Sequence, residues 1–193
     1  NVDRNDDIIY WEVWNEPDIK EYGGHSDYGL RNVSNYLKLY EASVKGALRA
    51  DPSVKLGAPS IAQSCTNGPV FGESCFWMGV GESPHHGEQF LDGLLSFVKE
   101  KNLPLGFVAF HGYVLQPKFY DDMINEYKNK IRAYDLDTEP ELVMSEWARW
   151  KAPIKEDNAA WTAAGIHYQM LSGLDLSCIT SFNAMIGETP NPY

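Results

Sequence analysis

Two glutamates stand at the ends of apolar runs that have the composition of buried strands. Glu16 follows the β-branched and aromatic run IIYWEVW over residues 8–14, and Glu146 ends the run ELVMSE over residues 141–146. We expect the first run to be a strand buried on both faces, and Pro17 to end its pairing and keep Glu16 extended. A carboxylate at the mouth of a buried strand is costly unless it is paired or used in chemistry. Each glutamate taken alone fits a structural ion pair as well as a functional role.

Two carboxylates on different strands are the pair that hydrolysis of a glycosidic bond requires. One carboxylic acid protonates the leaving oxygen, while the other carboxylate attacks the anomeric carbon or activates water. His111 and Tyr113 lie two apart on another apolar run, so they face the same side of a strand, and either can donate to Glu146. By the same alternation, Glu146 should share a face with Leu142 and Met144. The alternative for His111 is a hydrogen-bonded core histidine.

The chain alternates between strand patterns and helix patterns along its length. Helical spacing of apolar residues predicts helices over 34–50, 87–101, 118–134 and 161–171, and apolar runs predict strands over 8–14, 55–61, 106–114, 141–146 and from Cys178. Strands that alternate with helices of about 15 residues pair in parallel through right-handed crossovers. The order therefore predicts an α/β fold, as either an open doubly wound sheet or a (β/α)8 barrel.

Polar residues at the carboxyl ends of several predicted strands favour the barrel. The set comprises Asn15, Glu16, Ser60, His111, Glu146 and Asn183. A (β/α)8 barrel assembles its site at that face from several strands, whereas a dinucleotide-binding sheet would carry a GxGxxG turn, which this sequence lacks. A complete barrel needs eight strands in about 250 residues. We therefore expect residues 1–193 to be the C-terminal part of a single (β/α)8 barrel, a segment of a larger domain.

Composition and charge narrow the classes of partner. The 193 residues are 44% hydrophobic and carry a net charge of −11. This acidic balance argues against nucleic acid and anionic membranes, and no apolar run approaches the ~20 residues of a membrane helix. The long connection at 61–86 holds Cys65 and Cys75, which form either one disulfide or two free thiols. His85 and His86 nearby make zinc an alternative, but the spacing matches no structural zinc pattern, so we expect no metal and no cofactor.

Three motifs also resemble a known family. WNEP at 14–17, HGY at 111–113 and SEW at 145–147 resemble the fourth, sixth and seventh strands of clan A glycoside hydrolases. The surrounding sequence is most similar to glycoside hydrolase family 39, which holds β-xylosidases and α-L-iduronidases. The stretches that carry this similarity are EVWNEPD and, after it, YLKLYEASVKGALRADPSVKLGAPSIA. This resemblance runs nearly the whole chain and implies strands 4 to 8 of the barrel with their intervening helices, without strands 1 to 3 and the final helix.

The resemblance also implies roles for individual residues. It implies a retaining, β-xylosidase-like mechanism in which Glu16 is the general acid/base and Glu146 is the nucleophile. Asn15 matches the residue that hydrogen-bonds the sugar 2-hydroxyl in the clan. The implied partner is a carbohydrate, and we expect the active molecule to include more chain, either the N-terminal half of the barrel or a second chain.

Aromatic residues near these motifs are candidates for stacking on a sugar ring, because sugars present C–H faces to indole. Trp147 and Trp150 follow Glu146 directly, with packing against the adjacent helix as the alternative. In the last strand, Phe182 or Asn183 stands where many clan members place a tryptophan platform. The expected substrate contacts are Asn15, His111, Tyr113, Trp147, Trp14 and Phe182.

Two other functions are compatible with the same residues. A barrel that binds carbohydrate without turning it over would keep the strands and the carboxylates. An endo-acting glycanase of another clan A family would share the mechanism but cleave within a polymer.

Overall fold

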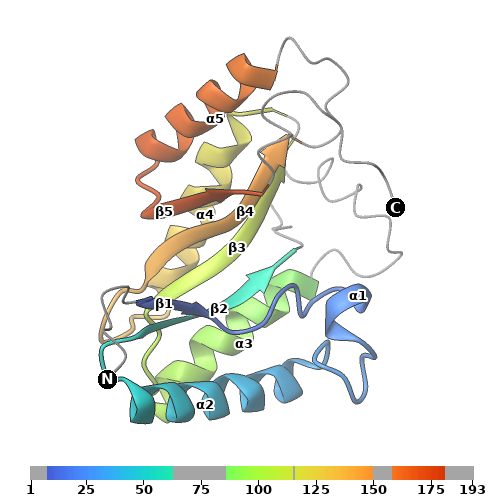
Figure 1. Cartoon of the computed structure of the whole chain (residues 1–193), viewed down its shortest axis with the longest axis vertical. Coiled ribbons are helices and arrows are strands. Elements are labelled where there is room, and N and C mark those ends of the chain that lie inside the picture. The colour runs from blue at the N-terminus through green and yellow to red at the C-terminus, as the bar shows by residue number, and fades with distance from the viewer. Residues whose placement is uncertain (1–7, 63–85, 115, 150–157, 181–193) are drawn as a thin grey trace, which may run out of the picture.

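The computed structural model describes residues 8–62, 86–114, 116–149 and 158–180. In that part of the chain, five parallel strands form one sheet in the order β1-β2-β3-β4-β5 (Figure 1). The strands are β1 Tyr10–Glu12, β2 Lys55–Ile61, β3 Phe107–Val114, β4 Glu141–Arg149 and β5 Leu176–Ile179. The helices are α1 Lys20–Gly23, α2 Val33–Ala50, α3 His86–Lys101, α4 Phe119–Ala133 and α5 Asn158–Leu171.

The four long helices, α2 to α5, lie along one face of this sheet (Figure 1). The core fills the space between them and the strands, with tyrosine, phenylalanine, leucine and isoleucine as its largest fully buried side chains. Strand and helix alternate as the sequence predicts, and the short α1 is the one helix among the described residues that the pattern missed. No helix in the described ranges combines the length and the apolar character needed to cross a bilayer. The five parallel strands, with helices between successive strands, confirm the predicted α/β partial barrel.

Buried tyrosines on the helices bind the backbone of the strands near their carboxyl ends. The hydroxyl of Tyr36 on α2 donates to the carbonyl of Val13 at 2.9 Å, and that of Tyr120 on α4 donates to the carbonyl of Gly112 at 2.9 Å. Both side chains are fully buried, so each hydroxyl needs such a partner. These bonds fix the backbone directly before WNEP and between His111 and Tyr113.

A polar contact across the inner face shows that the sheet is curled. The hydroxyl of Tyr10 on β1 donates to Glu141 on β4 at 2.6 Å, and Lys55 on β2 binds both of them. Neighbouring strands lie about 4.8 Å apart, so a flat sheet would hold β1 and β4 about 14 Å from each other. The hydrogen bond between these two side chains therefore requires the curvature of a barrel wall.

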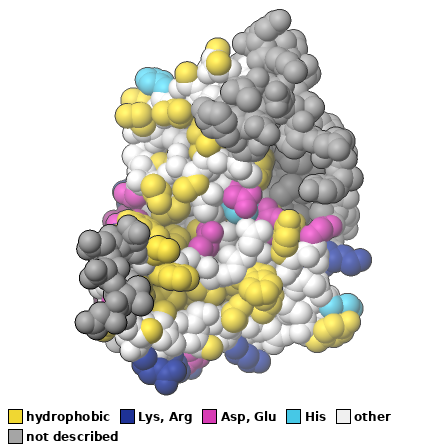
Figure 2. Space-filling view, in the orientation of Figure 1, with side chains coloured by type: hydrophobic (Ala, Val, Ile, Leu, Met, Phe, Trp, Pro, Cys, Tyr) yellow, Lys and Arg dark blue, Asp and Glu magenta, His cyan; other side chains and the backbone are white. Residues whose placement is uncertain are grey.

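β1 is shorter and more exposed than the sequence pattern predicts. The run over 8–14 forms a strand only at Tyr10–Glu12, and the side chains of Ile8, Trp11 and Trp14 are 66%, 52% and 50% exposed. The prediction of a strand buried on both faces is wrong for the described residues, since β1 pairs there with β2 alone and leaves one edge uncovered. Figure 2 shows hydrophobic side chains gathered on the molecular face over β1 and β2.

Gly57 in β2 leaves room for an aromatic ring, which gives a stability prediction. A Cβ added at Gly57 would lie 2.1 Å from two ring atoms of Phe107, which is itself buried. We expect Gly57→Ala to lower the free energy of unfolding by about 1–3 kcal/mol, because the ring must leave its position in a packed layer. Urea unfolding followed by circular dichroism measures this change.

Gly46 in α2 is the matched control for that substitution. A Cβ at Gly46 meets nothing within 4 Å, so Gly46→Ala removes only the helix penalty of glycine. It should raise the free energy of unfolding by about 1 kcal/mol. Equal effects of the two alanines would contradict the packing of Phe107 over Gly57.

Candidate active site

A bulge in β4 sets the direction of the Glu146 side chain. β3 and β4 pair Phe110 with Met144, but the next pair is His111 with Glu146, so Ser145 is an extra residue. Met144 is fully buried in the core against the helices, whereas the Glu146 side chain is 32% exposed and contacts His111. The prediction that Glu146 shares a face with Met144 is therefore wrong, because the inserted residue reverses the alternation.

Glu16 lies in a turn whose backbone is held against β2. After β1 ends, the N–H of Val13 still donates to Gly57 at 2.9 Å, and the N–H of Glu16 donates to the carbonyl of Ser60 at 3.0 Å. Trp14 and Glu16 both have positive φ, 70° and 44°. The prediction that Glu16 stays extended is wrong, because this turn holds both residues in the left-handed region, a conformation that costs of order 1–3 kcal/mol at a non-glycine residue.

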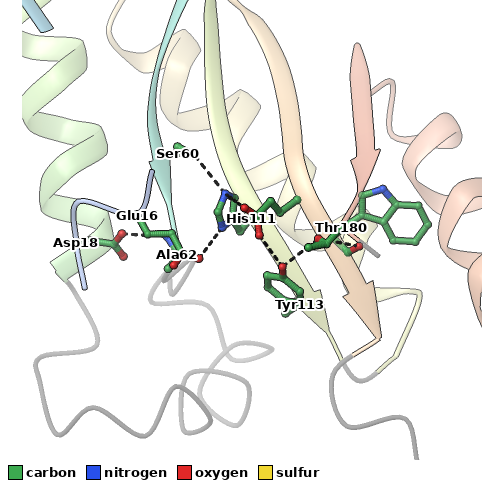
Figure 3. A network of polar contacts seen from close by, with 9 residues as sticks. Glu16, Asp18, Ser60, Ala62, His111, Tyr113 and Thr180 are labelled. Atoms are coloured by element: carbon green, nitrogen blue, oxygen red, sulfur yellow. Dashed lines mark hydrogen bonds and ion pairs between the residues drawn. The ribbon is translucent and has the colours of Figure 1, made fainter. Parts of the chain in front are cut away.

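Asp18 anchors this turn, a role that the sequence pattern did not predict. Its side chain is almost fully buried, and its Oδ1 accepts the N–H of Ala62 at 2.9 Å (Figure 3). The contact ties the segment after Glu16 to the carboxyl end of β2. A charged residue directly after NEP is the signal that could have indicated it, since a carboxylate there must find a donor once it is buried.

The structure brings four of the predicted site residues into one network (Figure 3). Nδ1 of His111 lies 2.7 Å from Oε1 of Glu16, and its Nε2 lies 3.2 Å from Oγ of Ser60 and 3.7 Å from Oε1 of Glu146. The hydroxyl of Tyr113 donates to Oε2 of Glu146 at 2.7 Å. His111 therefore bridges the two carboxylates, and Tyr113 holds Glu146 from the other side.

The charge of His111 depends on its carboxylate neighbours. Burial, the largest single influence, lowers its pKa, but the hydrogen bond to Glu16 and the charges of Glu146 and Glu16 together outweigh burial. The pKa of His111 is consequently raised above its ordinary value. A raised pKa stabilises the folded protein fully below the ordinary histidine value of about 6.5, and this contribution is lost as the pH rises through the folded value.

We expect the ¹⁵N titration of His111 in the folded protein to have its midpoint above pH 6.5. Glu16→Gln should lower that midpoint, because an amide keeps a hydrogen-bonding oxygen but removes the negative charge. The resonance is assigned by its loss in His111→Gln. A midpoint that does not move in Glu16→Gln would contradict the direct contact between the two side chains.

Tyr113 serves as a donor rather than as an acid. Burial raises the pKa of its phenol, and the hydrogen bond to Glu146 raises it further, so the hydroxyl keeps its proton throughout the ordinary pH range. A phenol that stays protonated can donate to the carboxylate of Glu146 and fix its direction.

Trp147 does not face the site. Its side chain is only 3% exposed and packs in the core against the rings of Tyr120 and Trp161, with centroids 5.7 Å and 6.3 Å away. The prediction that it stacks on a sugar is therefore wrong, and packing against the adjacent helix is what the structure has. The reason is again the bulge, which turns Trp147 toward the helices when it turns Glu146 away from them. Trp150 and Phe182 lie outside the described residues.

Trp14 and Asn15 directly precede Glu16 in the turn after β1. The indole N–H of Trp14 donates to the carbonyl of Tyr22 at 3.0 Å, and the Trp14 side chain is half exposed. Asn15 is half-buried next to Glu16. His25, in the loop beyond, stacks on Tyr28 with centroids 4.2 Å apart, so these two rings pack on each other.

The network also has the composition of a metal site. Glu16, His111 and Glu146 each offer one ligand atom, and these atoms lie within 4.8 Å of one another. The imidazole already hydrogen-bonds Glu16, however, and a cation would have to displace that contact. The two carboxylates of a catalytic pair would lie equally close. The other set considered for zinc, Cys65, Cys75, His85 and His86, lies outside the side chains that the structure describes.

Known proteins are similar to this chain in sequence and in fold. A curated relative, the β-xylosidase of Geobacillus stearothermophilus, is 26% identical over 103 residues, which cover 53% of this chain and 15% of the relative. A solved glucosidase from Croceicoccus marinus aligns with a TM-score of 0.68 at 23% identity, covering 89% of this chain and 32% of its own. A monomeric β-xylosidase from Caulobacter crescentus aligns with a TM-score of 0.64 at 18% identity, and the alignment covers 94% of this chain and 35% of the xylosidase.

The two solved enzymes have the fold of this chain, and both are longer than it. The chain spans about a third of the length of the two solved enzymes. The model of Glycosyl hydrolases family 39 matches residues 6–161, a range that includes the WNEP turn, the HGY strand and the SEW strand. With most of its length matched, and with the two glutamates placed by those strands, the chain belongs to glycosyl hydrolases family 39.

Proposed function

We propose that this chain carries the catalytic pair of a retaining glycosidase that cleaves O-glycosidic bonds of β-linked sugars. One observation carries the proposal: an oxygen of Glu16 and an oxygen of Glu146 lie within 4.8 Å of each other. Retaining glycosidases place their two carboxyl groups about 5–5.5 Å apart, whereas inverting enzymes need about 6.5–9.5 Å to admit a water. An oxygen-to-oxygen approach this close agrees with the shorter of these separations, which is the one that direct attack of a carboxylate on the sugar requires.

In this proposal Glu146 is the nucleophile and Glu16 is the general acid/base. In the first step, the proton of Glu16 passes to the leaving oxygen while Glu146 bonds to the anomeric carbon. In the second step, Glu16 takes a proton from water, and the water oxygen displaces Glu146. Two contacts support this division, because Tyr113 donates to Oε2 of Glu146 and fixes the direction of that carboxylate, while His111 contacts Oε1 of Glu16.

The sugar is proposed to contact residues beside the pair. Asn15, which precedes Glu16, would bind the 2-hydroxyl, and the half-exposed ring of Trp14 would stack on the sugar. The names of two relatives, both β-xylosidases, favour a β-xyloside as substrate, and the solved glucosidase makes a β-glucoside the nearest competitor.

The active molecule is proposed to contain more of the barrel than this chain. Within the described residues, β1 and β5 each have a sheet neighbour on one side only. Large apolar side chains are exposed near both edges, among them Ile8, Trp11, Met170 and Leu176. Three further parallel strands between β1 and β5 would cover these side chains and supply the remaining walls of the site.

Hydrolysis assays on the protein that contains this chain test the proposed function. Release of nitrophenol from 4-nitrophenyl β-D-xylopyranoside, faster than from the β-D-glucopyranoside, is the expected result. Sugar binding without any released product would favour the non-catalytic barrel instead. Internal cleavage of xylan, with oligomers as the first products, would favour an endo-acting enzyme.

A further inference from the structure

Thr180, at the carboxyl end of β5, extends the network around Glu146. Its Oγ1 lies 2.9 Å from the phenolic oxygen of Tyr113 and 3.3 Å from the carbonyl of Trp147, and its own N–H donates to that carbonyl at 3.1 Å (Figure 3). The residue is exposed, so it is not held there by core packing. Its backbone is fixed to β4, and its hydroxyl points to the side chain that holds Glu146.

Tyr113 and Thr180 each have a single hydroxyl proton, and this fixes the direction of the hydrogen bonds between Thr180, Tyr113 and Glu146. An ionised carboxylate only accepts, so the single proton of Tyr113 must go to Glu146. In its contact with Thr180 the phenolic oxygen can then only accept, and the single proton of the Thr180 hydroxyl goes to this oxygen at 2.9 Å rather than to the more distant carbonyl of Trp147 at 3.3 Å. A donor to the phenolic oxygen polarises the phenol and strengthens its own donation, as in other hydrogen-bond chains. The bond from Thr180 also lowers the pKa of Tyr113, against burial and Glu146, which raise it.

We propose that Thr180 is a positioning residue for the nucleophile, acting through Tyr113. This inference rests on the proposed function, because it takes Glu146 to be the carboxylate that forms and leaves the glycosyl ester. The chain runs Thr180 to Tyr113 to Glu146, from β5 through β3 to β4, so that three strands hold one carboxylate.

Such a chain affects the two catalytic steps differently. When Glu146 leaves the sugar in the second step, negative charge develops on its oxygens, and a stronger donor stabilises that charge. When Glu146 attacks in the first step, the same donor stabilises the starting carboxylate and gives no acceleration. Loss of the Thr180 hydroxyl should therefore slow the second step and spare the first.

The test compares Thr180→Val, which keeps the shape and removes the hydroxyl, with Thr180→Ser, which keeps the hydroxyl. On an aryl β-xyloside with a good leaving group, the second step limits kcat, while kcat/KM reports the first. We expect Thr180→Val to lower kcat about fivefold with little change in kcat/KM. Thr180→Ser should retain the wild-type kcat. Equal losses of kcat and kcat/KM, equal losses in both variants, or no loss in Thr180→Val would overturn the proposal.

A second readout separates this inference from the proposed function. The hydroxyl proton of Tyr113, assigned by its absence in Tyr113→Phe, should give a low-field NMR resonance because it is held by a carboxylate. It should move upfield in Thr180→Val and stay in place in Thr180→Ser. A resonance that behaves this way in a protein that releases no product would overturn the hydrolase and keep the Thr180 contact. A resonance that is unmoved in Thr180→Val would overturn the positioning role itself.

Discussion

Glu146→Ala is expected to lower kcat on aryl β-xylosides by on the order of 10⁴-fold or more. The substitution removes the oxygen that bonds to the sugar in the proposed mechanism, and with it the acceptor of the Tyr113 hydroxyl. The folded site should otherwise persist, since Glu146 is partly exposed and the bulge belongs to the backbone. Steady-state kinetics with a chromogenic substrate measures the loss.

Azide distinguishes a lost nucleophile from a damaged fold. With Glu146 absent, azide can enter from the side of the missing carboxylate and should give the α-glycosyl azide. Glu139→Ala is the control, because Glu139 lies in the loop just before the same strand and is exposed in an ion pair with Arg132. It should leave kcat unchanged. A Glu146→Ala enzyme that keeps a tenth or more of its kcat would contradict the assignment.

Glu16→Ala is expected to divide substrates by their leaving group. Loss of the general acid should cost about 10²–10⁴-fold in kcat/KM for an alkyl xyloside or xylobiose, whose leaving oxygen needs a proton. Substrates such as dinitrophenyl xyloside leave without one, so their kcat/KM should fall much less. The slope of log kcat/KM against the leaving-group pKa measures the change.

The same variant reports the second role of Glu16. Without a base to activate water, the glycosyl ester on Glu146 should accumulate, and added azide should release it as the β-glycosyl azide. This product has the opposite configuration to the one expected from Glu146→Ala, so the two variants identify the two roles independently. Equal losses on good and poor leaving groups would count against Glu16 as the acid.

Much of this arrangement could be predicted from sequence because it depends on local patterns. The apolar runs and helical spacings gave the order of the elements, and the strand at Lys55–Ile61 matches its prediction at both ends. The pairing of His111 and Tyr113 on one face followed from an alternation that β3 keeps without interruption, and both side chains reach Glu146.

The wrong predictions for Glu16, Glu146 and Trp147 share one physical cause: alternation and propensity do not detect where a strand is interrupted by a bulge or a turn. The bulge at Ser145 reverses the faces of Glu146 and Trp147, and it is visible only in the register of β4 with its neighbours β3 and β5. The positive φ of Glu16 likewise depends on the carbonyl of Ser60, far along the chain. Thr180 had no signal of its own, because its role comes from a hydroxyl that lies against a residue two strands away.

The most direct test of the central assignment is the configuration of the first sugar released. Proton NMR resolves the α and β anomers of xylose within minutes of adding enzyme to an aryl β-xyloside, before they interconvert in water. Attack by Glu146 followed by attack of water inverts the anomeric carbon twice, so β-xylose should appear first. If α-xylose appears first, water attacks the sugar directly and Glu146 is not the nucleophile.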